Sequence, residues 1–308
     1  FPVSPALLLW KEQDSLQVVR VIGVQVNPKQ SYDALVLEGG SLRCAFTAGV
    51  LDAFATVGFN PFQSYYAVSA GSMALTSFLS GQRKHFINVA SQLVEDGEFI
   101  RFTSAFSEEG LMNLAHLAHV VRSSDPIDWD AAYAAIEGKR LSIVAADCET
   151  GEPHYLHPEK GNWMRLVLAS CTLPLLTRGR IQVGGRWVFD GGYADAIPLN
   201  RAVEDGHRRI VVVRTRPSGF QIERATLDWL ASYWFRDNEA IAKLFESSHE
   251  QYNRVVDQLR TGGIGTATWA EIAPFEPLQS DGYSVSASDL RADYRHGMEA
   301  GLDWLSIV

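Results

Sequence analysis

One serine, Ser69, stands between an apolar run and a helix-like segment in "YYAVSAGSMAL", residues 65–75. Serine is an effective nucleophile when a sharp strand-to-helix turn exposes its Oγ and directs the helix N-terminus toward a developing oxyanion. Such a turn crowds the backbone two residues to either side, so its usual pattern is G-x-S-x-G. Here Ala67 replaces the first glycine, Ala70 follows the serine and Gly71 keeps the second glycine. Alanine adds only a methyl group, so the motif predicts a nucleophile or, as the alternative, a serine that caps the helix.

A second motif, "LEGGSLR" at residues 37–43, places Gly39 and Gly40 just before a helix-like segment. Glycines let the backbone turn its amide groups inward, and amides so arranged bind anions. The stretch has no lysine and matches neither GxxxxGK[ST] nor G-x-G-x-x-G, which argues against a phosphate-binding loop. An oxyanion hole suits these residues better, and the alternative is a plain glycine turn.

A third motif, "VFDGGYADAIPL" at residues 188–199, ends a predicted strand on Asp190 and continues with two glycines that permit a sharp turn. Parallel strands bring their carboxyl ends to one edge of a sheet, so a carboxylate here is predicted to reach a serine at the end of a neighbouring strand. The alternative is an aspartate that only forms the turn before the glycines.

These motifs need a scaffold in which strands and helices alternate. Apolar runs closed by turn residues predict buried strands at 34–37, 65–68, 140–147, 186–190 and 208–215. Helical spacing of apolar residues predicts helices at 42–58, 70–81, within 82–138, at 162–174 and at 289–305. Two strand-to-helix turns in the first third of the chain argue for a parallel α/β sheet. The first 31 residues are predicted to be an irregular extension, and the chain beyond Pro217 to be chiefly helical.

The composition is that of a packed protein, since 46% of the 308 residues are hydrophobic and 20% are charged, which excludes the disordered and fibrous classes. The net charge is −9 and Lys and Arg form no long run, so no nucleic-acid partner is expected. Three cysteines far apart in the sequence fit a reducing compartment better than a disulfide framework. No apolar run approaches the roughly 18 residues of a membrane span. We therefore expect a cytoplasmic protein, soluble or peripheral to a membrane.

Together the three motifs resemble, in order and character, those of the patatin-like phospholipases. The signatures of that family are a G-G-G-x-R-G loop, a G-x-S-x-G elbow and a D-G-[GA] motif. The matching stretches are "ALVLEGGSLRCAFTAGVLDAF", "AVSAG" and "DGGYADAIPL", and the resemblance covers roughly residues 33–215. It is closest to the bacterial branch, in which a strand "LVLEGG" leads into "FTAGVLDAF".

The resemblance implies a three-layer α/β/α fold with a central, mainly parallel sheet and a mainly helical C-terminal region. It divides the chain into an extension at 1–31, a catalytic core at 32–216 and a helical region at 217–308 that packs on the core. It also implies a serine acyl hydrolase that acts on phospholipids or lysophospholipids without metal or cofactor, and that makes transient contact with a membrane surface.

By this resemblance Ser69 is the nucleophile and Asp190 completes a Ser-Asp dyad. The loop at Gly39 and Gly40 would supply the oxyanion hole through the backbone amides of Gly40 and Ser41, and Arg43 would hold that loop in place. The first two motifs depart from the family pattern at three positions, each of which holds a small residue. Ser41 replaces the third glycine, Cys44 the glycine after the arginine, and Ala67 the first glycine of the elbow.

Two other functions remain open from the sequence. One is a Ser-Asp-His esterase for small soluble esters, whose histidine would follow the acid and would be His207, His249 or His296. The other is a lipid-binding or regulatory protein that keeps the fold but has lost the catalytic geometry through its substitutions. Two histidine pairs, His116 with His119 and His154 with His157, have no third metal ligand at a recognisable spacing.

Overall fold

The structure is a computed structural model of the 308-residue chain. It describes residues 7–12, 15–20, 32–97, 114–123, 125–173, 180–223, 237–281 and 285–308. The aromatic residues of the C-terminal third that the sequence suggests as core or acyl-pocket residues, Trp229, Tyr233, Trp234 and Phe235, lie outside the described residues.

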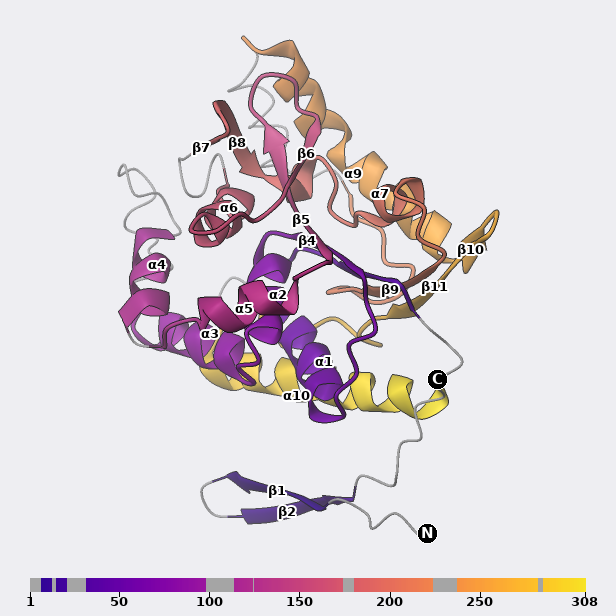
Figure 1. Cartoon of the computed structure of the whole chain (residues 1–308). Coiled ribbons are helices and arrows are strands. Elements are labelled where there is room, and N and C mark those ends of the chain that lie inside the picture. The colour runs from indigo at the N-terminus through magenta and orange to yellow at the C-terminus, as the bar shows by residue number, and fades with distance from the viewer. Residues whose placement is uncertain are drawn as a thin grey trace.

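A nine-stranded mixed sheet forms the centre of the described structure (Figure 1), with strand order β10-β11-β9-β3-β4-β5-β8-β7 and β6 paired to β5. The bounds are β3 Ala34–Leu37, β4 Ser64–Val68, β5 Arg140–Asp147, β6 Pro153–Leu156, β7 Ile181–Val183, β8 Arg186–Asp190, β9 Arg209–Val213, β10 Gly263–Ile264 and β11 Ala267–Ile272. The five central strands from β11 to β5 are parallel, and β6, β7, β8 and β10 add antiparallel pairs. The predicted α/β sheet with mostly parallel strands is confirmed.

Helices cover both faces of the sheet because alternate residues of its central strands point to opposite sides. In β3, Leu35 and Leu37 belong to one apolar cluster with residues of α1, α2 and α6, whereas Ala34 and Val36 belong to another with residues of α7 and α9. The helix bounds are α1 Cys44–Thr56, α2 Ala70–Leu79, α3 His85–Glu95, α4 Leu114–Ser123, α5 Trp129–Ala135, α6 Trp163–Ser170, α7 Leu199–Glu204, α9 Glu239–Leu259 and α10 Ala287–Ile307. The three-layer architecture predicted from the family resemblance is thus present.

The C-terminal helix α10 lies along α1 on one face of the sheet (Figure 1). The two backbones approach so closely that a Cβ on Gly297 would lie 2.0 Å from the carbonyl oxygen of Phe46, and one on Gly49 would lie 2.1 Å from that of Tyr294. Glycine at both crossing points therefore allows the last helix to pack directly against the helix that follows the glycine loop.

One segment differs from the sequence prediction, and another holds an element that was not predicted. Leu7–Glu12 (β1) and Ser15–Arg20 (β2) pair as an antiparallel hairpin, where an irregular extension was predicted. The described part of the region beyond 217 is chiefly helical, as predicted, but it also contributes β11, which joins the central sheet beside β9. The run "LLLWKE" and the strand "ATWAEI" lack the strict apolar alternation that marks a strand, which is why pattern alone missed both.

Candidate active site

Ser69 lies on the sharp turn between β4 and α2. Its backbone has φ +51° and ψ −133°, a conformation that a non-glycine residue adopts only under constraint from its surroundings. A Cβ on Gly71 would lie 2.7 Å from the carbonyl oxygen of Glu38, so the second glycine of the elbow is needed for this close approach. Ala67 is buried in β4 and Ala70 begins α2. The methyl group of Ala67 is accommodated where the family pattern has glycine.

The side chains of Ser69 and Asp190 meet directly, with Ser69 Oγ donating a hydrogen bond of 2.6 Å to Asp190 Oδ2. The sequence argument that brought them together was wrong in one respect, because β8 runs antiparallel to its neighbour β5. Asp190 nevertheless arrives beside the end of β4, since it pairs with Ala145 while Val68 pairs with Val144. The register on β5, rather than parallel strand ends, places the two side chains together.

Asp190 is buried, with 3% of its surface exposed. Its second oxygen, Oδ1, accepts a hydrogen bond of 2.7 Å from the backbone N–H of Gly192. Burial raises the pKa of Asp190 from 3.8 to about 6, although the hydrogen bonds from Ser69 and Gly192 oppose the rise. A carboxylate whose pKa lies nearer to neutral is a better acceptor for a serine proton at physiological pH. Asp195 has a similarly raised pKa, but its carboxylate accepts a hydrogen bond from Tyr155.

Ser170 at the end of α6 supports the turn and was not anticipated from the sequence. Its Oγ accepts a hydrogen bond of 2.7 Å from the backbone N–H of Ser69 and donates one of 2.5 Å to the carbonyl oxygen of Val144. The hydroxyl therefore ties the backbone of Ser69 to β5, the strand that pairs with Asp190 of β8. Only its polar character at the end of an apolar helix sets Ser170 apart in the sequence.

The glycine loop after β3 lies beside Ser69. A Cβ on Gly39 would lie 3.2 Å from the Cβ of Ser69, and one on Gly40 would lie 2.6 Å from Thr215 Oγ1. Ser41 has φ +51°, which is the conformation that the third glycine of the family motif would adopt without strain. Among the described residues, none accepts a hydrogen bond from the backbone N–H of Gly40 or Ser41.

Arg43 extends from this loop toward the C-terminal region. Its Nη1 donates to Asp281 Oδ1 at 2.8 Å, and Arg216 Nη1 donates to the other oxygen of the same carboxylate at 2.9 Å. Asp281 ends the short 3-10 helix η4, Gln279–Asp281. Arg43 thus links the loop to a segment more than two hundred residues away in the sequence.

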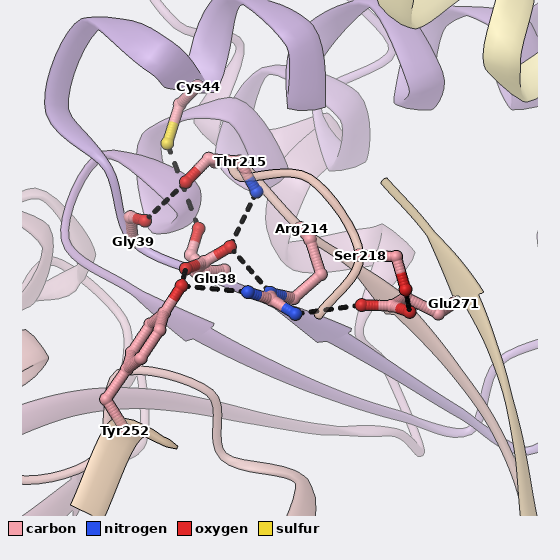
Figure 2. Close-up of polar contacts among 8 residues, drawn as sticks. All are labelled: Glu38, Gly39, Cys44, Arg214, Thr215, Ser218, Tyr252 and Glu271. Atoms are coloured by element: carbon pink, nitrogen blue, oxygen red, sulfur yellow. Dashed lines mark hydrogen bonds and ion pairs between the residues drawn. The ribbon is translucent and has the colours of Figure 1, made fainter. Parts of the chain in front are cut away.

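Beneath the loop, Glu38 accepts three hydrogen bonds in a buried polar network (Figure 2). Arg214 Nε donates to Oε2 at 3.0 Å, the backbone N–H of Thr215 donates to the same oxygen at 2.6 Å, and the Tyr252 hydroxyl donates to Oε1 at 2.7 Å. Thr215 Oγ1 also donates to the carbonyl oxygen of Gly39 at 3.1 Å. Glu38, which precedes the glycine pair, is therefore held at both carboxylate oxygens, and Gly39 is held at its carbonyl oxygen.

Arg214 is fully buried and connects Glu38 to a second carboxylate. Its Nη1 donates to Glu271 Oε1 at 2.8 Å and its Nη2 to the Tyr252 hydroxyl at 2.8 Å, while Ser218 Oγ donates to Glu271 Oε2 at 2.6 Å (Figure 2). Burial alone would lower the pKa of Arg214, but Glu38, Tyr252 and Glu271 raise it above its ordinary value. The guanidinium therefore stays charged, as a buried charge with such partners should.

Neither cysteine near the site behaves as a nucleophile. Burial raises the pKa of Cys171 well above its ordinary value, and it raises that of Cys44 to about 12. Cys44 Sγ instead donates a long hydrogen bond of 3.8 Å to the carbonyl oxygen of Glu38. A thiol in such surroundings stays protonated near neutral pH, which leaves Ser69 as the nucleophilic candidate.

An apolar cavity of about 830 Å³, part of it open to solvent, begins at Ser69 and Ser41. Most of its wall is aliphatic or aromatic, and the polar side chains in it are few. Its lining comes from α2, α3, α4, α6 and the start of α5, and includes Met73, Phe86, Val89, Val121, Trp129 and Val167. The nucleophile thus faces a chamber suited to a hydrocarbon chain.

The histidines of the triad hypothesis lie elsewhere. His207 faces Asp33 and the ring of Tyr66, and His296 packs against the rings of Phe46 and Phe275. His249 belongs to α9, and its Nδ1 is buried with no hydrogen-bond partner among the described residues. In the part of the chain that the structure describes, none of the three histidines hydrogen-bonds Ser69 or Asp190.

Within the described ranges, no group of three or more His, Cys, Asp or Glu side chains could hold a metal ion. In the histidine pairs noted in the sequence, His116 forms a hydrogen bond with the Asp96 carboxylate, and His157 forms one with the carbonyl oxygen of Leu141. Among the helices that the structure describes, none has the length and apolar character needed to cross a membrane.

Comparisons with known proteins agree with the motifs. A sequence model of the patatin-like phospholipase family matches residues 35–203, more than half of the chain. The uncharacterized protein YjjU of Escherichia coli (strain K12) is 32% identical over 280 residues, which cover 89% of this chain and 77% of YjjU. The crystal structure of VipD from Legionella pneumophila aligns with a TM-score of 0.46 at 13% identity, over 97% of this chain and 70% of VipD. On the family match and the YjjU similarity, this chain belongs to the patatin-like phospholipase family.

Proposed function

We propose that this protein is a serine acyl hydrolase that cleaves fatty-acyl esters of phospholipids or lysophospholipids through an acyl-enzyme. The observation that carries the proposal is the hydrogen bond of 2.6 Å from Ser69 Oγ to the buried carboxylate of Asp190, at the head of an apolar cavity. A hydroxyl paired with a base at this distance matches the geometry of an activated nucleophile.

In the first half of the reaction, Ser69 Oγ attacks the ester carbonyl while its proton passes to Asp190 Oδ2. The carbonyl oxygen becomes an oxyanion, and the backbone amides of Gly40 and Ser41 donate hydrogen bonds to it. Asp190 then returns the proton to the leaving alcohol as the C–O bond breaks. The acyl group remains on Ser69, with its chain in the apolar cavity.

In the second half, a water molecule takes the place of the alcohol. Asp190 accepts its proton as the water oxygen attacks the acyl carbonyl, and the proton then passes to Ser69 Oγ as the fatty acid leaves. The raised pKa of Asp190 suits both directions of transfer, because the carboxyl group must accept and release a proton in each half. Contact with a lipid surface remains a prediction of the family resemblance.

A fluorophosphonate probe and an ester panel test this proposal together. Wild type should be labelled covalently and should hydrolyse phospholipids, lysophospholipids or p-nitrophenyl esters, and Ser69→Ala should lose both properties. Ser91→Ala is the control, because Ser91 is a buried serine of α3 that does not line the cavity. Absence of labelling and hydrolysis in folded wild type would instead favour the lipid-binding alternative.

A further inference from the structure

The residues that line the cavity indicate that its long axis runs along helix α2. Its wall includes Ser69 and Ala70 at the start of this helix, then Met73, then Thr76 and Ser77. Residues three and four positions apart lie on one face of an α-helix, so these side chains form a single stripe. The long axis of the cavity therefore follows α2 away from the nucleophile.

Helix α6 packs beside α2 in the reverse direction and also contributes to the cavity wall. Near its end, Ser170 Oγ accepts a hydrogen bond from the backbone N–H of Ser69 at 2.7 Å. At its start, Trp163 Nε1 donates to Thr76 Oγ1 at 3.1 Å. The two contacts join the same two helices at opposite ends, so the cavity wall is held at both the nucleophile and the far end.

At the end of α2 far from Ser69, the cavity wall includes a buried polar pair. His85, which is 5% exposed, and Ser77 both line the cavity, and His85 Nδ1 lies 2.8 Å from Ser77 Oγ. His85 Nε2 lies 2.8 Å from the carbonyl oxygen of Asp125 and must donate to it. Ser77 Oγ also lies 3.2 Å from the carbonyl oxygen of Met73. Both ring nitrogens of His85 are hydrogen-bonded, so this part of the wall does not move aside without losing hydrogen bonds.

The turn between α2 and α3 is also fixed to the segment before α5. Gln82 Nε2 donates to the carbonyl oxygen of Pro126 at 2.9 Å, and the backbone N–H of Asp128 donates to Gln82 Oε1 at 2.8 Å. With the His85 contact to Asp125, three hydrogen bonds hold one short stretch against the other. The segments around His85 are therefore held in place by several hydrogen bonds.

From Ser69 to Ser77 is eight residues of helix, or about 12 Å at about 1.5 Å per residue. An extended hydrocarbon chain with C–C bonds of about 1.5 Å advances about 1.3 Å per carbon, so roughly nine or ten carbons span this distance. We propose that the cavity selects acyl chains of medium length, about eight to ten carbons, and that the His85–Ser77 pair sets this limit. The inference rests on the proposed function in taking the occupant to be the acyl group of the Ser69 ester.

Chain-length dependence is the direct measurement. For wild type acting on p-nitrophenyl esters with four to sixteen acyl carbons, kcat/KM should rise about three- to fourfold per carbon, as each methylene leaves water. The rise should stop near ten carbons, and the sixteen-carbon ester should react at least about tenfold more slowly than the best substrate. A rise that continues to sixteen carbons would overturn the proposal.

Two variants separate the cavity from general effects on folding. Met73 lies one turn along α2 from Ser69, so Met73→Trp should block the cavity after about four or five carbons and move the optimum to the four-carbon ester. Asn88→Ala is the control, because Asn88 is on the exposed face of α3 and should leave the profile unchanged. An optimum that Met73→Trp does not move, in a variant with the wild-type circular-dichroism melt, would contradict the assignment of the cavity.

A binding measurement decides the chain limit without catalysis. In Ser69→Ala, saturated fatty acids of six to sixteen carbons should displace an anilinonaphthalene sulfonate probe with affinity that rises to about ten carbons and then levels off. If no ester is hydrolysed but this plateau appears, the proposed function fails and the length limit stands. If esters are hydrolysed in a Ser69-dependent way but affinity rises through sixteen carbons, the proposed function stands and the length limit fails.

Discussion

The two strand-to-helix turns that form the site hold their shape by different means. The turn after β4 is supported close to the nucleophile, through the conformation of Ser69 itself and through Ser170 on the adjoining helix. The turn after β3 also contains a serine at φ +51°, Ser41, but it rests on Glu38 and Arg214, an ion pair between residues 176 positions apart. The candidate nucleophile is thus positioned by single hydrogen bonds to Asp190 and to Ser170, and the candidate oxyanion hole by a buried charged network.

This difference predicts where substitutions act. Changes to the side chains of Ser69 and Asp190 should remove chemistry and spare the fold, because these side chains hydrogen-bond each other and, beyond that, only the N–H of Gly192 bonds the Asp190 carboxylate among the described residues. Changes beneath the first turn should affect both stability and rate, because a buried ion pair that loses one partner leaves an uncompensated charge. The following variants test the comparison, from the largest expected effect to the smallest.

Ser69→Ala and Asp190→Asn should each lower kcat by about a thousandfold or more, because each removes one half of the proton-transfer pair. The double variant should be about as slow as either single variant, since the two side chains act as one unit. Initial rates with a p-nitrophenyl ester provide the measurement. Additive losses, with the double variant slower by the product of the two factors, would show that the residues act separately.

Ser41→Pro should lower kcat by about 100- to 1000-fold, because proline removes the backbone N–H that is proposed to face the oxyanion. Ser41→Gly is its matched control and should keep the wild-type rate. Glycine should also raise the free energy of unfolding by up to about 1 kcal/mol, since φ +51° costs glycine no strain. A folded Ser41→Pro variant with nearly the wild-type rate would exclude this amide from the oxyanion hole.

Arg214→Met should destabilise the protein by about 3–5 kcal/mol, because it leaves Glu38 and Glu271 buried without their cation. Tyr252→Phe removes one hydroxyl from the same network and should cost only about 1–2 kcal/mol. Urea unfolding gives both free energies of unfolding. The value of kcat, measured at urea concentrations well below the unfolding midpoint, reports whether the glycine loop keeps its catalytic geometry. Equal, small losses of stability in Arg214→Met and Tyr252→Phe would mean that the charge of Arg214 does not hold the turn after β3.

The pH dependence of the rate and of stability should both reflect Asp190. The base must be ionised, so kcat/KM should fall as pH drops through about 6. In the folded protein this pKa is raised from 3.8, so the native state binds the proton more tightly than the unfolded chain, and stability falls as pH rises from about 4 to about 6.

Asp190→Asn removes that titration and provides the stability test. Between pH 4 and pH 7, the free energy of unfolding of the variant should rise by about 2–3 kcal/mol relative to that of wild type. The reason is that the pKa of Asp190 is shifted by about two units, and each unit corresponds to about 1.4 kcal/mol. Thermal or urea unfolding at the two pH values measures the difference between the proteins. A difference that does not change with pH would show that Asp190 has an ordinary pKa.

Much of this molecule follows from local sequence patterns. The apolar runs at β3, β4, β5 and β9 predict strands close to where they occur, because a buried strand needs consecutive apolar residues and a turn to end it. The elbow and the glycine loop are equally local, since their shapes depend on a few small residues at fixed spacing. The contact between Ser69 and Asp190 also followed from motif and family resemblance.

The tertiary structure decided what depends on pairing between distant segments. The direction of β8 and its register on β5 are set by which strands meet, and no pattern within "RWVFD" records that choice. Arg214 looks in the sequence like the end of an apolar strand, and only the fold brings it against Glu38, Tyr252 and Glu271. The wall of the cavity likewise contains a long-range contact, the one between His85 and Asp125, which are 40 residues apart. Local residue types determine the elements and the chemical groups, but partners, register and the closed end of a cavity arise from long-range packing, whose energy is shared among many residues.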